Sequence, residues 1–257
     1  MMGTLARAAR AAPSLLAVAL VWELAGDAGL VRPIFLPALS RVLAQAGPLW
    51  RDGAILEPLG ESLFRAFAGL ALAVVVGTLA GVAMARQRWL AWLLDPLVSL
   101  GFPAPKIAFV PIFILWFGID HLSKILLVAF SCVFPMILSA HHGAASVSPK
   151  LIWSAQAMGS KERQILLRVV LPAALPALFS GLRVTLPLAL ITAFTAEMVA
   201  GGGGVGAALM FAQRFFETPT VFFYILVMLT SGLVLDHALL ALRRRLIGWA
   251  GDSALDH

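Results

Sequence analysis

The stretch SAQAMGSKERQILLRVVLPAALP, Ser154 to Pro176, is polar, basic and punctuated by glycine and proline, and it lies between two long apolar runs. Elsewhere the chain is strongly apolar. Of its 257 residues 61% are hydrophobic and 12% are charged, and the mean hydropathy is +0.94. A soluble domain carries about 25% charged residues, so this chain has too little polar surface to cover a globule in water. We therefore expect lipid to surround most of the chain, and Ser154–Pro176 to lie in water.

Six segments are apolar enough and long enough to cross a membrane, which takes about 20 residues of helix. The predicted spans are 13–30, 63–85, 93–117, 123–142, 178–199 and 220–241. The first span contains Glu23 and Asp27 and is short enough to resemble a signal peptide. No Ala-x-Ala-like cleavage site follows it, which favours a retained helix. The prediction is a single all-α transmembrane domain over residues 1–257.

Basic residues indicate how the spans are oriented. They cluster before the first predicted span and after the second, fourth and sixth. These residues are Arg7, Arg10, Arg86, Arg88, Lys150, Lys161, Arg163, Arg168 and Arg243 to Arg245. The opposite loops carry fewer basic residues, partly offset by acidic ones. By the positive-inside rule, both termini and the loop at about 145–177 are predicted to be cytoplasmic.

The first half of this loop has clear helix start and stop signals. Ser148 is predicted to cap a helix that has Pro149 in its first position, where the missing N–H costs nothing. Gly159 is placed to end that helix in the left-handed conformation. The expected apolar face comprises Leu151, Ala155 and Met158.

A second helix is expected to follow, capped by Ser160 and with Glu162 in its first turn. Its apolar residues are Ile165, Leu166, Val169 and Val170. Pro172 and Pro176 are expected to break it, so that it does not continue unchanged into the next span. Such a loop has two interpretations: an amphipathic connector on the membrane surface, or a rigid knuckle that docks into a partner's groove.

The spacing of Ala155, Gly159 and Val169-x-Leu171-Pro172 resembles the cytoplasmic signature of the inner-membrane permeases of ABC importers. That signature reads Glu-Ala-Ala, three residues, Gly, nine residues, Ile-x-Leu-Pro. The match departs from it at the front of the motif and at one later position. Trp153 stands where the family has glutamate, Ser154 where it has the first alanine, and Val169 where it has isoleucine.

Further segments resemble the nitrate/sulfonate/taurine-type permeases in order and spacing. They are FPAPKIAFVPIFILWFGI (102–119), GLRVTLPLALITAFTAEM (181–198) and SGLVLDHALLALRRRLIGW (231–249). Ser62, Arg65 and Gly69 are compatible with the same pattern. The resemblance implies the type I importer architecture, in a multi-pass protein of the bacterial inner (plasma) membrane.

The resemblance implies a half-pore that works with other subunits: a second permease copy, cytoplasmic ABC ATPases, and an extracytoplasmic substrate-binding protein. The solute would be small and anionic, and the cytoplasmic loop between Ser154 and Pro172 would couple to the ATPase. The implied coupling residues are Trp153, Ser154, Ala155, Met158, Gly159, Val169, Leu171 and Pro172.

No G-x-x-x-x-G-K-[ST] motif is present in the sequence. We therefore expect a transport subunit that hydrolyses no ATP and binds no cofactor. ATP-Mg would be used by the partner ATPase. The GGGG of Gly201 to Gly204 lacks the lysine and is predicted to be a loop at the outer end of a span. The alternatives are an ATP-independent channel or secondary carrier, and a membrane enzyme, for which we find no catalytic constellation. Nucleic-acid binding is not expected, because the basic residues follow apolar segments instead of forming a patch.

Three charged residues are candidates for the translocation path. Glu197 either lines the path or pairs across a dimer, or else it anchors the helix end near Gly201. Arg183 either attracts an anion or holds the loop, or else it snorkels to the interface. Lys106 either faces the pore or binds carbonyls that the nearby prolines leave free. No metal site is expected from Cys132 or from the adjacent His141 and His142.

Overall fold

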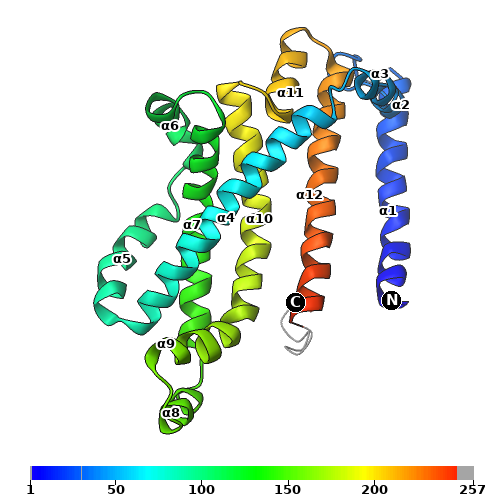
Figure 1. Ribbon diagram of the computed structural model, residues 1–257. Coiled ribbons are helices and arrows are strands. Elements are labelled where there is room, and N and C mark those ends of the chain that lie inside the picture. Colours follow the sequence, from blue (N-terminus) through cyan, green and yellow to red (C-terminus); the bar gives the residue numbers. More distant parts are fainter. Residues whose placement is uncertain (1, 30, 248–257) are drawn as a thin grey trace.

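The computed structural model describes residues 2–29 and 31–247, and within these ranges the chain is helical with no strand (Figure 1). The long helices are α1 (Met2–Asp27), α4 (Leu56–Arg86), α7 (His121–Ala145), α10 (Leu171–Ala200) and α12 (Thr218–Leu246). The shorter ones are α2 (Leu39–Ala44), α3 (Ala46–Arg51), α5 (Arg88–Gly101), α6 (Val110–Phe117), α8 (Pro149–Ala157), α9 (Glu162–Ile165) and α11 (Val205–Arg214). A 3-10 turn covers Lys106–Phe109, and a π-helix covers Leu166–Val170.

Four helices in the described part are long and apolar enough to cross a membrane: Leu56–Arg86, His121–Ala145, Glu162–Ala200 and Thr218–Leu246. They contain the predicted spans 63–85, 123–142, 178–199 and 220–241. The predicted first span, 13–30, falls on α1, which is not among these four; residue 30 lies outside the described part. The sequence therefore predicted more spans than the four, or five with a bent pair, that the described residues provide.

The predicted span 93–117 is wrong as a single helix. Arg88–Gly101 and Lys106–Phe117 are two apolar helices that meet at 95° across a short break, as a broken span or a re-entrant loop. The break contains Pro103 and Pro105. Proline donates no backbone hydrogen bond and forces the residue before it out of the helical region, so two prolines this close end the helix instead of only distorting it.

The core lies where α4, α7 and α10 pack against one another. Close contact depends on glycines of α4: a Cβ at Gly77 would lie 2.6 Å from Met136 Cβ, and one at Gly81 would lie 2.3 Å from the carbonyl oxygen of Ile137. Small residues four positions apart allow this approach, as in other membrane helix pairs. Cys132 is fully buried in this core, which confirms that it is a packing residue.

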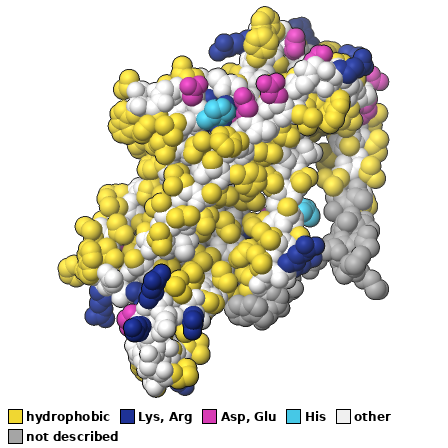
Figure 2. All heavy atoms as spheres, viewed as in Figure 1, with side chains coloured by type: hydrophobic (Ala, Val, Ile, Leu, Met, Phe, Trp, Pro, Cys, Tyr) yellow, Lys and Arg dark blue, Asp and Glu magenta, His cyan; other side chains and the backbone are white. Residues whose placement is uncertain are grey.

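The two ends of the helical bundle differ in charge. Figure 1 shows α8 and α9 at one end, and α2, α3 and α11 at the other. α1 starts, and α12 finishes, on the side of α8 and α9. In Figure 2 hydrophobic side chains cover the middle of the visible face, and acidic side chains gather near the end opposite to α8 and α9. The orientation itself was predicted from the basic residues, and the acidic residues only offset the basic ones in the opposite loops.

Candidate functional site

The loop at 145–177 forms the knuckle predicted for it. Ser148 is the N-cap residue of α8 and Pro149 follows in its first turn, although the Ser148 side chain makes no capping hydrogen bond. Gly159 has φ +76° and ends the turn. The N–H of Ser160 donates to the carbonyl oxygen of Ala155 at 3.0 Å, which closes this end of the helix. The helix and the left-handed glycine are therefore confirmed.

Two details of the second helix were predicted wrongly. Lys161, not Ser160, is the N-cap of α9, and its N–H donates to Gln164 Oε1 at 2.8 Å. The chain is not broken at Pro172, because α9 continues through the π-helix Leu166–Val170 into α10 as one apolar helix. Pro172 lies in the first turn of α10, where the wider π turn before it accommodates the missing N–H and the proline ring.

The residues of the expected apolar face of α8 differ in burial. Ala155 is 5% exposed and packs with Ile165 and Val170, so it anchors the knuckle to the rest of the protein. Trp153 is 64% exposed and Met158 is 78% exposed. Leu151, Trp153 and Met158 are therefore the exposed large apolar side chains of this part of the knuckle, with Leu151 and Trp153 on opposite sides of α8.

The remaining predicted coupling residues lie around this core. Ser154 and Gly159 are exposed, whereas Val169, Leu171 and Pro172 are half-buried where the π-helix enters α10. Arg86, at the end of α4, forms an ion pair with Glu162 at 2.9 Å. Glu162 is largely exposed and Arg86 is partly exposed, so this pair holds the knuckle to α4 with at most about 1 kcal/mol.

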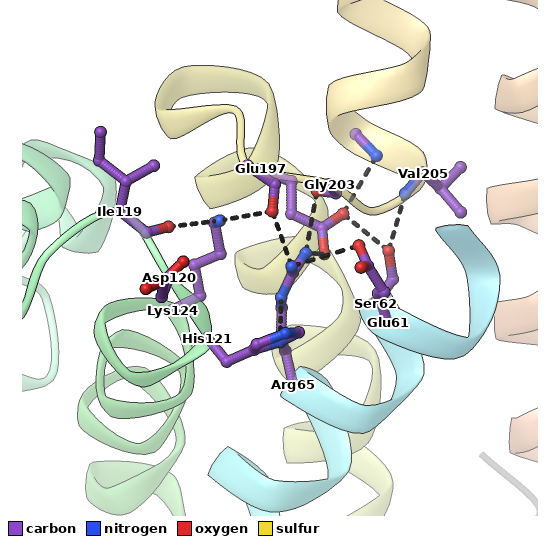
Figure 3. A network of polar contacts seen from close by, with 12 residues as sticks. Glu61, Ser62, Arg65, Ile119, Asp120, His121, Lys124, Glu197, Gly203 and Val205 are labelled. Atoms are coloured by element: carbon purple, nitrogen blue, oxygen red, sulfur yellow. Dashed lines mark hydrogen bonds and ion pairs between the residues drawn. The ribbon is translucent and has the colours of Figure 1, made fainter. Parts of the chain in front are cut away.

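At the opposite end of the bundle, Arg65 is the centre of a buried polar cluster (Figure 3). Its side chain is 1% exposed, and all five of its N–H groups are used. Nε donates to His121 Nδ1 at 3.1 Å. Nη1 donates to Glu197 Oε1 at 2.7 Å and to the Gly203 carbonyl at 2.9 Å. Nη2 donates to the Gly202 carbonyl at 2.8 Å and to Glu61 Oε2 at 3.3 Å. The guanidinium therefore joins α4 to α7 and to the loop after α10.

Glu197 is the anionic partner in this cluster and is 0% exposed. Its Oε2 accepts hydrogen bonds from Ser62 Oγ at 2.7 Å and from the N–H of Gly206 at 3.1 Å. Ser62 Oγ in turn accepts from the N–H of Val205 at 2.9 Å. Both carboxylate oxygens are thus paired within one subunit, which favours the anchoring interpretation of Glu197 in this conformation.

The loop Gly201–Gly204 passes over Arg65 with four positive φ angles, from +67° to +90°. A Cβ at Gly203 would lie 2.1 Å from Glu61 Oε2, and one at Gly204 would lie 2.3 Å from the Glu197 carboxylate. Only glycine combines this backbone with such close contact. The GGGG sequence is therefore a loop, as predicted. The carbonyls of Gly202 and Gly203 accept hydrogen bonds from Arg65.

Sequence reasoning did not identify most of this cluster. Lys124 is 1% exposed, and its Nζ donates to the carbonyls of Ile119 at 2.8 Å and Gly202 at 3.3 Å. The signal that was present is that Arg65 and Glu197 are opposite charges, each inside a predicted span. Charged groups in a span tend to pair, so the two were candidates for each other.

The other two candidates for the path lie elsewhere. Lys106 Nζ donates to the Gly101 carbonyl at 2.8 Å and to the Phe102 carbonyl, which agrees with the carbonyl-binding alternative. Arg183 Nε lies 3.8 Å from Asp236 Oδ1. Since Arg183 and Glu197 are about 21 Å apart along α10 at the helical rise per residue, the structure does not bring the three together. Among the described residues, no group of three or more His, Cys, Asp or Glu side chains is placed to hold a metal ion.

A membrane-spanning helical bundle with an exposed helix–glycine–helix knuckle at its basic end defines a transport permease. Residues 73–248 match the family described as "Binding-protein-dependent transport system inner membrane component". The chain belongs to this family of ABC importer permeases and is a multi-pass membrane protein. An ATP-independent channel or carrier is not favoured.

Several relatives cover most of the chain. It is 35% identical over 237 residues to the taurine transport system permease protein TauC of Escherichia coli (strain K12), with 90% of this chain and 86% of TauC covered. It is 32% identical to the putative aliphatic sulfonates transport permease protein SsuC of Bacillus subtilis (strain 168), with 89% and 83% covered. The riboflavin transport system permease protein RibX of Chloroflexus aurantiacus is also 32% identical, with 79% and 77% covered.

A solved structure supports the fold. The inward-facing MetNI methionine ABC transporter matches with a TM-score of 0.53 and 22% identity, over 72% of this chain and 94% of that chain. The likeness confirms the all-α architecture of an ABC importer permease.

Proposed function

We propose that this permease carries a small sulfonate, of the taurine or aliphatic sulfonate class, through a pore built from two copies of the chain. The relatives named for those solutes support the solute class, because they align over more than four fifths of this chain. The experiment is growth on taurine or on an alkanesulfonate as sole sulfur source, in a strain that lacks its own sulfonate permeases. The permease must be supplied with its binding protein and ATPase. A strain that grows on neither taurine nor the alkanesulfonate would reject the solute class.

ATP hydrolysis is assigned to separate cytoplasmic ATPases that use ATP-Mg, and this chain binds no cofactor. The knuckle is the coupling element. The observation that carries this proposal is that Leu151, Trp153 and Met158 are exposed on a short helix whose Ala155 packs in the core. Apolar side chains on a short fixed helix are what a partner's groove recognises. Because tryptophan replaces the family's glutamate, shape and apolar contact account for the coupling in this chain, without an ionic contact at Trp153.

The proposed orientation places both termini and the knuckle in the bacterial cytoplasm, and the Arg65 cluster on the side where a substrate-binding protein docks. The basic residues of the loop at 145–177 and of the end of α12 support it. A cysteine at position 159 or 53 would test it. Cys132 is first replaced in the protein. In intact cells, a membrane-impermeant thiol reagent should then label position 53 and not position 159.

Glu197 and Lys106 are proposed to shape the path without contacting the solute. Glu197 fixes the loop 201–204 through Arg65, and Lys106 fixes the bend between α5 and α6 by binding two carbonyls. A carboxylate whose oxygens are already paired offers nothing to a sulfonate, and its charge would repel one. These residues therefore serve gating, in keeping with the expected solute charge.

A further inference from the structure

An open apolar groove runs along α10 and α12. It has a volume of about 520 Å³, and its walls include Leu190, Phe194, Met228 and Gly232. No residue in the most apolar stretch of α12 is fully buried in the described structure, and Ile225, Leu229 and Leu233 on the groove are exposed. The groove ends, toward the knuckle side of the bundle, at Asp236.

One helical turn beyond the groove, the same two helices enclose a smaller cavity of about 240 Å³. Its lining includes Ser180 and Arg183 of α10 and Leu239 and Arg243 of α12. The apolar groove is thus followed along the helix pair by a pocket that contains two guanidinium groups. Its lining residues belong to the first part of α10 and the last part of α12, which lie toward the end of the bundle where α8 and α9 are found (Figure 1).

The charges of this pocket do not cancel. Arg183 is 42% exposed, and its contact with Asp236 is 3.8 Å long, which is beyond hydrogen-bonding distance. Arg243 is half-buried and makes no hydrogen bond or ion pair to another described residue through its side chain. Within the described residues, two guanidinium groups therefore lie beside one carboxylate, which leaves a net positive charge in this pocket.

We infer that this groove and pocket form a binding site for one anionic phospholipid, with an acyl chain along the α10–α12 groove and the phosphate between Arg183 and Arg243. Basic pockets between transmembrane helices on the cytoplasmic side are suited to anionic headgroups. The groove also has the required length. From Pro187 to Met198 it follows α10 for about 17 Å, and one leaflet contributes about 15 Å of hydrocarbon. The site goes beyond transport and is independent of the solute proposed above.

The test uses the full chain purified with its ATPase in a neutral detergent. Phosphatidylglycerol and phosphatidylcholine with the same acyl chains are titrated separately, and the bound lipid is counted by native mass spectrometry. We expect phosphatidylglycerol to bind about tenfold more tightly than phosphatidylcholine or better, since each arginine near a headgroup adds attraction. Arg183→Gln combined with Arg243→Gln should abolish the difference. Arg88→Gln removes an exposed arginine on another helix, α5, and should leave it intact.

A second variant tests the groove itself. A Cβ at Gly232 would have no atom closer than Leu190 Cδ1 at 4.0 Å, so Gly232→Leu fills the groove without forcing the helices apart. It should weaken binding of both lipids, because it competes with the acyl chain. An unchanged helix content in circular dichroism and retained ATPase in the purified complex show that each variant is folded.

Three results would overturn the inference. Equal binding of the two lipids by the wild-type protein would show that the arginines do not select a headgroup. Displacement of bound phosphatidylglycerol by taurine would assign the pocket to the solute. Loss of the permease dimer in Gly232→Leu, with lipid binding unchanged, would assign the groove to a second copy of the chain.

Discussion

The Arg65 guanidinium and the Glu197 carboxylate meet at 2.7 Å, although they are 132 residues apart in the sequence and almost wholly buried. Their contact joins α4 to the end of α10. Every donor of the arginine and both oxygens of the glutamate are occupied, so neither side chain can be changed without leaving the other unsatisfied.

Replacing one member of this pair should be costly. Glu197→Gln removes the buried counter-ion of Arg65 and leaves only the partly exposed Glu61 carboxylate at 3.3 Å, so the loss is expected to be about 3 kcal/mol of stability. The measurement is thermal unfolding of the purified protein in detergent. Glu57→Gln removes an exposed carboxylate from the same end of the bundle and should shift the unfolding temperature little. Adding Arg65→Met to Glu197→Gln should recover part of the loss, and a double variant less stable than Glu197→Gln would contradict the pairing.

Substitution in the glycine loop should depend on position. Gly201 and Gly203 both have positive φ angles, +67° and +83°. A Cβ at Gly201 meets no atom within 4 Å, whereas one at Gly203 would collide with Glu61. Gly201→Ala therefore measures backbone strain alone, about 1–2 kcal/mol. Gly203→Ala should lose more stability and should also lower sulfonate uptake, and equal effects would show that the Glu61 contact does not matter.

Gly159 can be tested against a glycine of matched conformation. Gly159 and Gly53 have φ of +76° and +72°, and a Cβ at either position would meet no atom within 4 Å. Gly159→Ala and Gly53→Ala should therefore destabilise the protein by similar amounts, about 1–2 kcal/mol each. Only Gly159→Ala should reduce stimulation of the ATPase by loaded binding protein. If both variants retain full stimulation, the knuckle does not depend on its glycine.

The two faces of α8 should respond differently. Trp153→Ala removes exposed apolar surface, so it should weaken co-purification of the ATPase while leaving thermal stability nearly unchanged. Ala155→Leu overfills the core around Ile165, at a cost of about 1–3 kcal/mol. Leu167→Ala serves as the control, because it also removes an exposed apolar side chain, 51% exposed, but from the π-helix and not from α8. It should leave co-purification of the ATPase unchanged. Retention of the ATPase by Trp153→Ala at wild-type level would argue against this surface as the contact.

Local features were predictable from the sequence because their causes are local. Pro149 and Gly159 define the first knuckle helix, and the four uninterrupted spans are visible as apolar runs of sufficient length. The family spacing from Ala155 to Pro172 led to the same class of protein as the comparisons. None of these predictions required knowledge of which helices are neighbours.

The errors arose where tertiary contacts decide. The burial of Ala155 was not predicted, because helical spacing identifies a stripe of residues but not which of them the core covers. Pro172 was expected to break the helix, whereas a π turn preserves it. The partner of Glu197 was not found, since Arg65 approaches it only when α4, α7 and α10 are packed together. Such pairings depend on the fold as a whole.

The ion pair of Arg86 with Glu162 has a mechanical consequence when considered with Arg65. Both arginines belong to α4, an uninterrupted helix on which they lie about 32 Å apart along the axis. The Arg65 end of α4 is fixed to the glycine loop by buried hydrogen bonds, whereas the Arg86 end is joined to the knuckle by one exposed ion pair. A helix changes its length very little. A displacement of the knuckle along the axis of α4 would therefore move the Arg65 cluster, on the other side of the membrane, without a chain of intermediate side-chain movements.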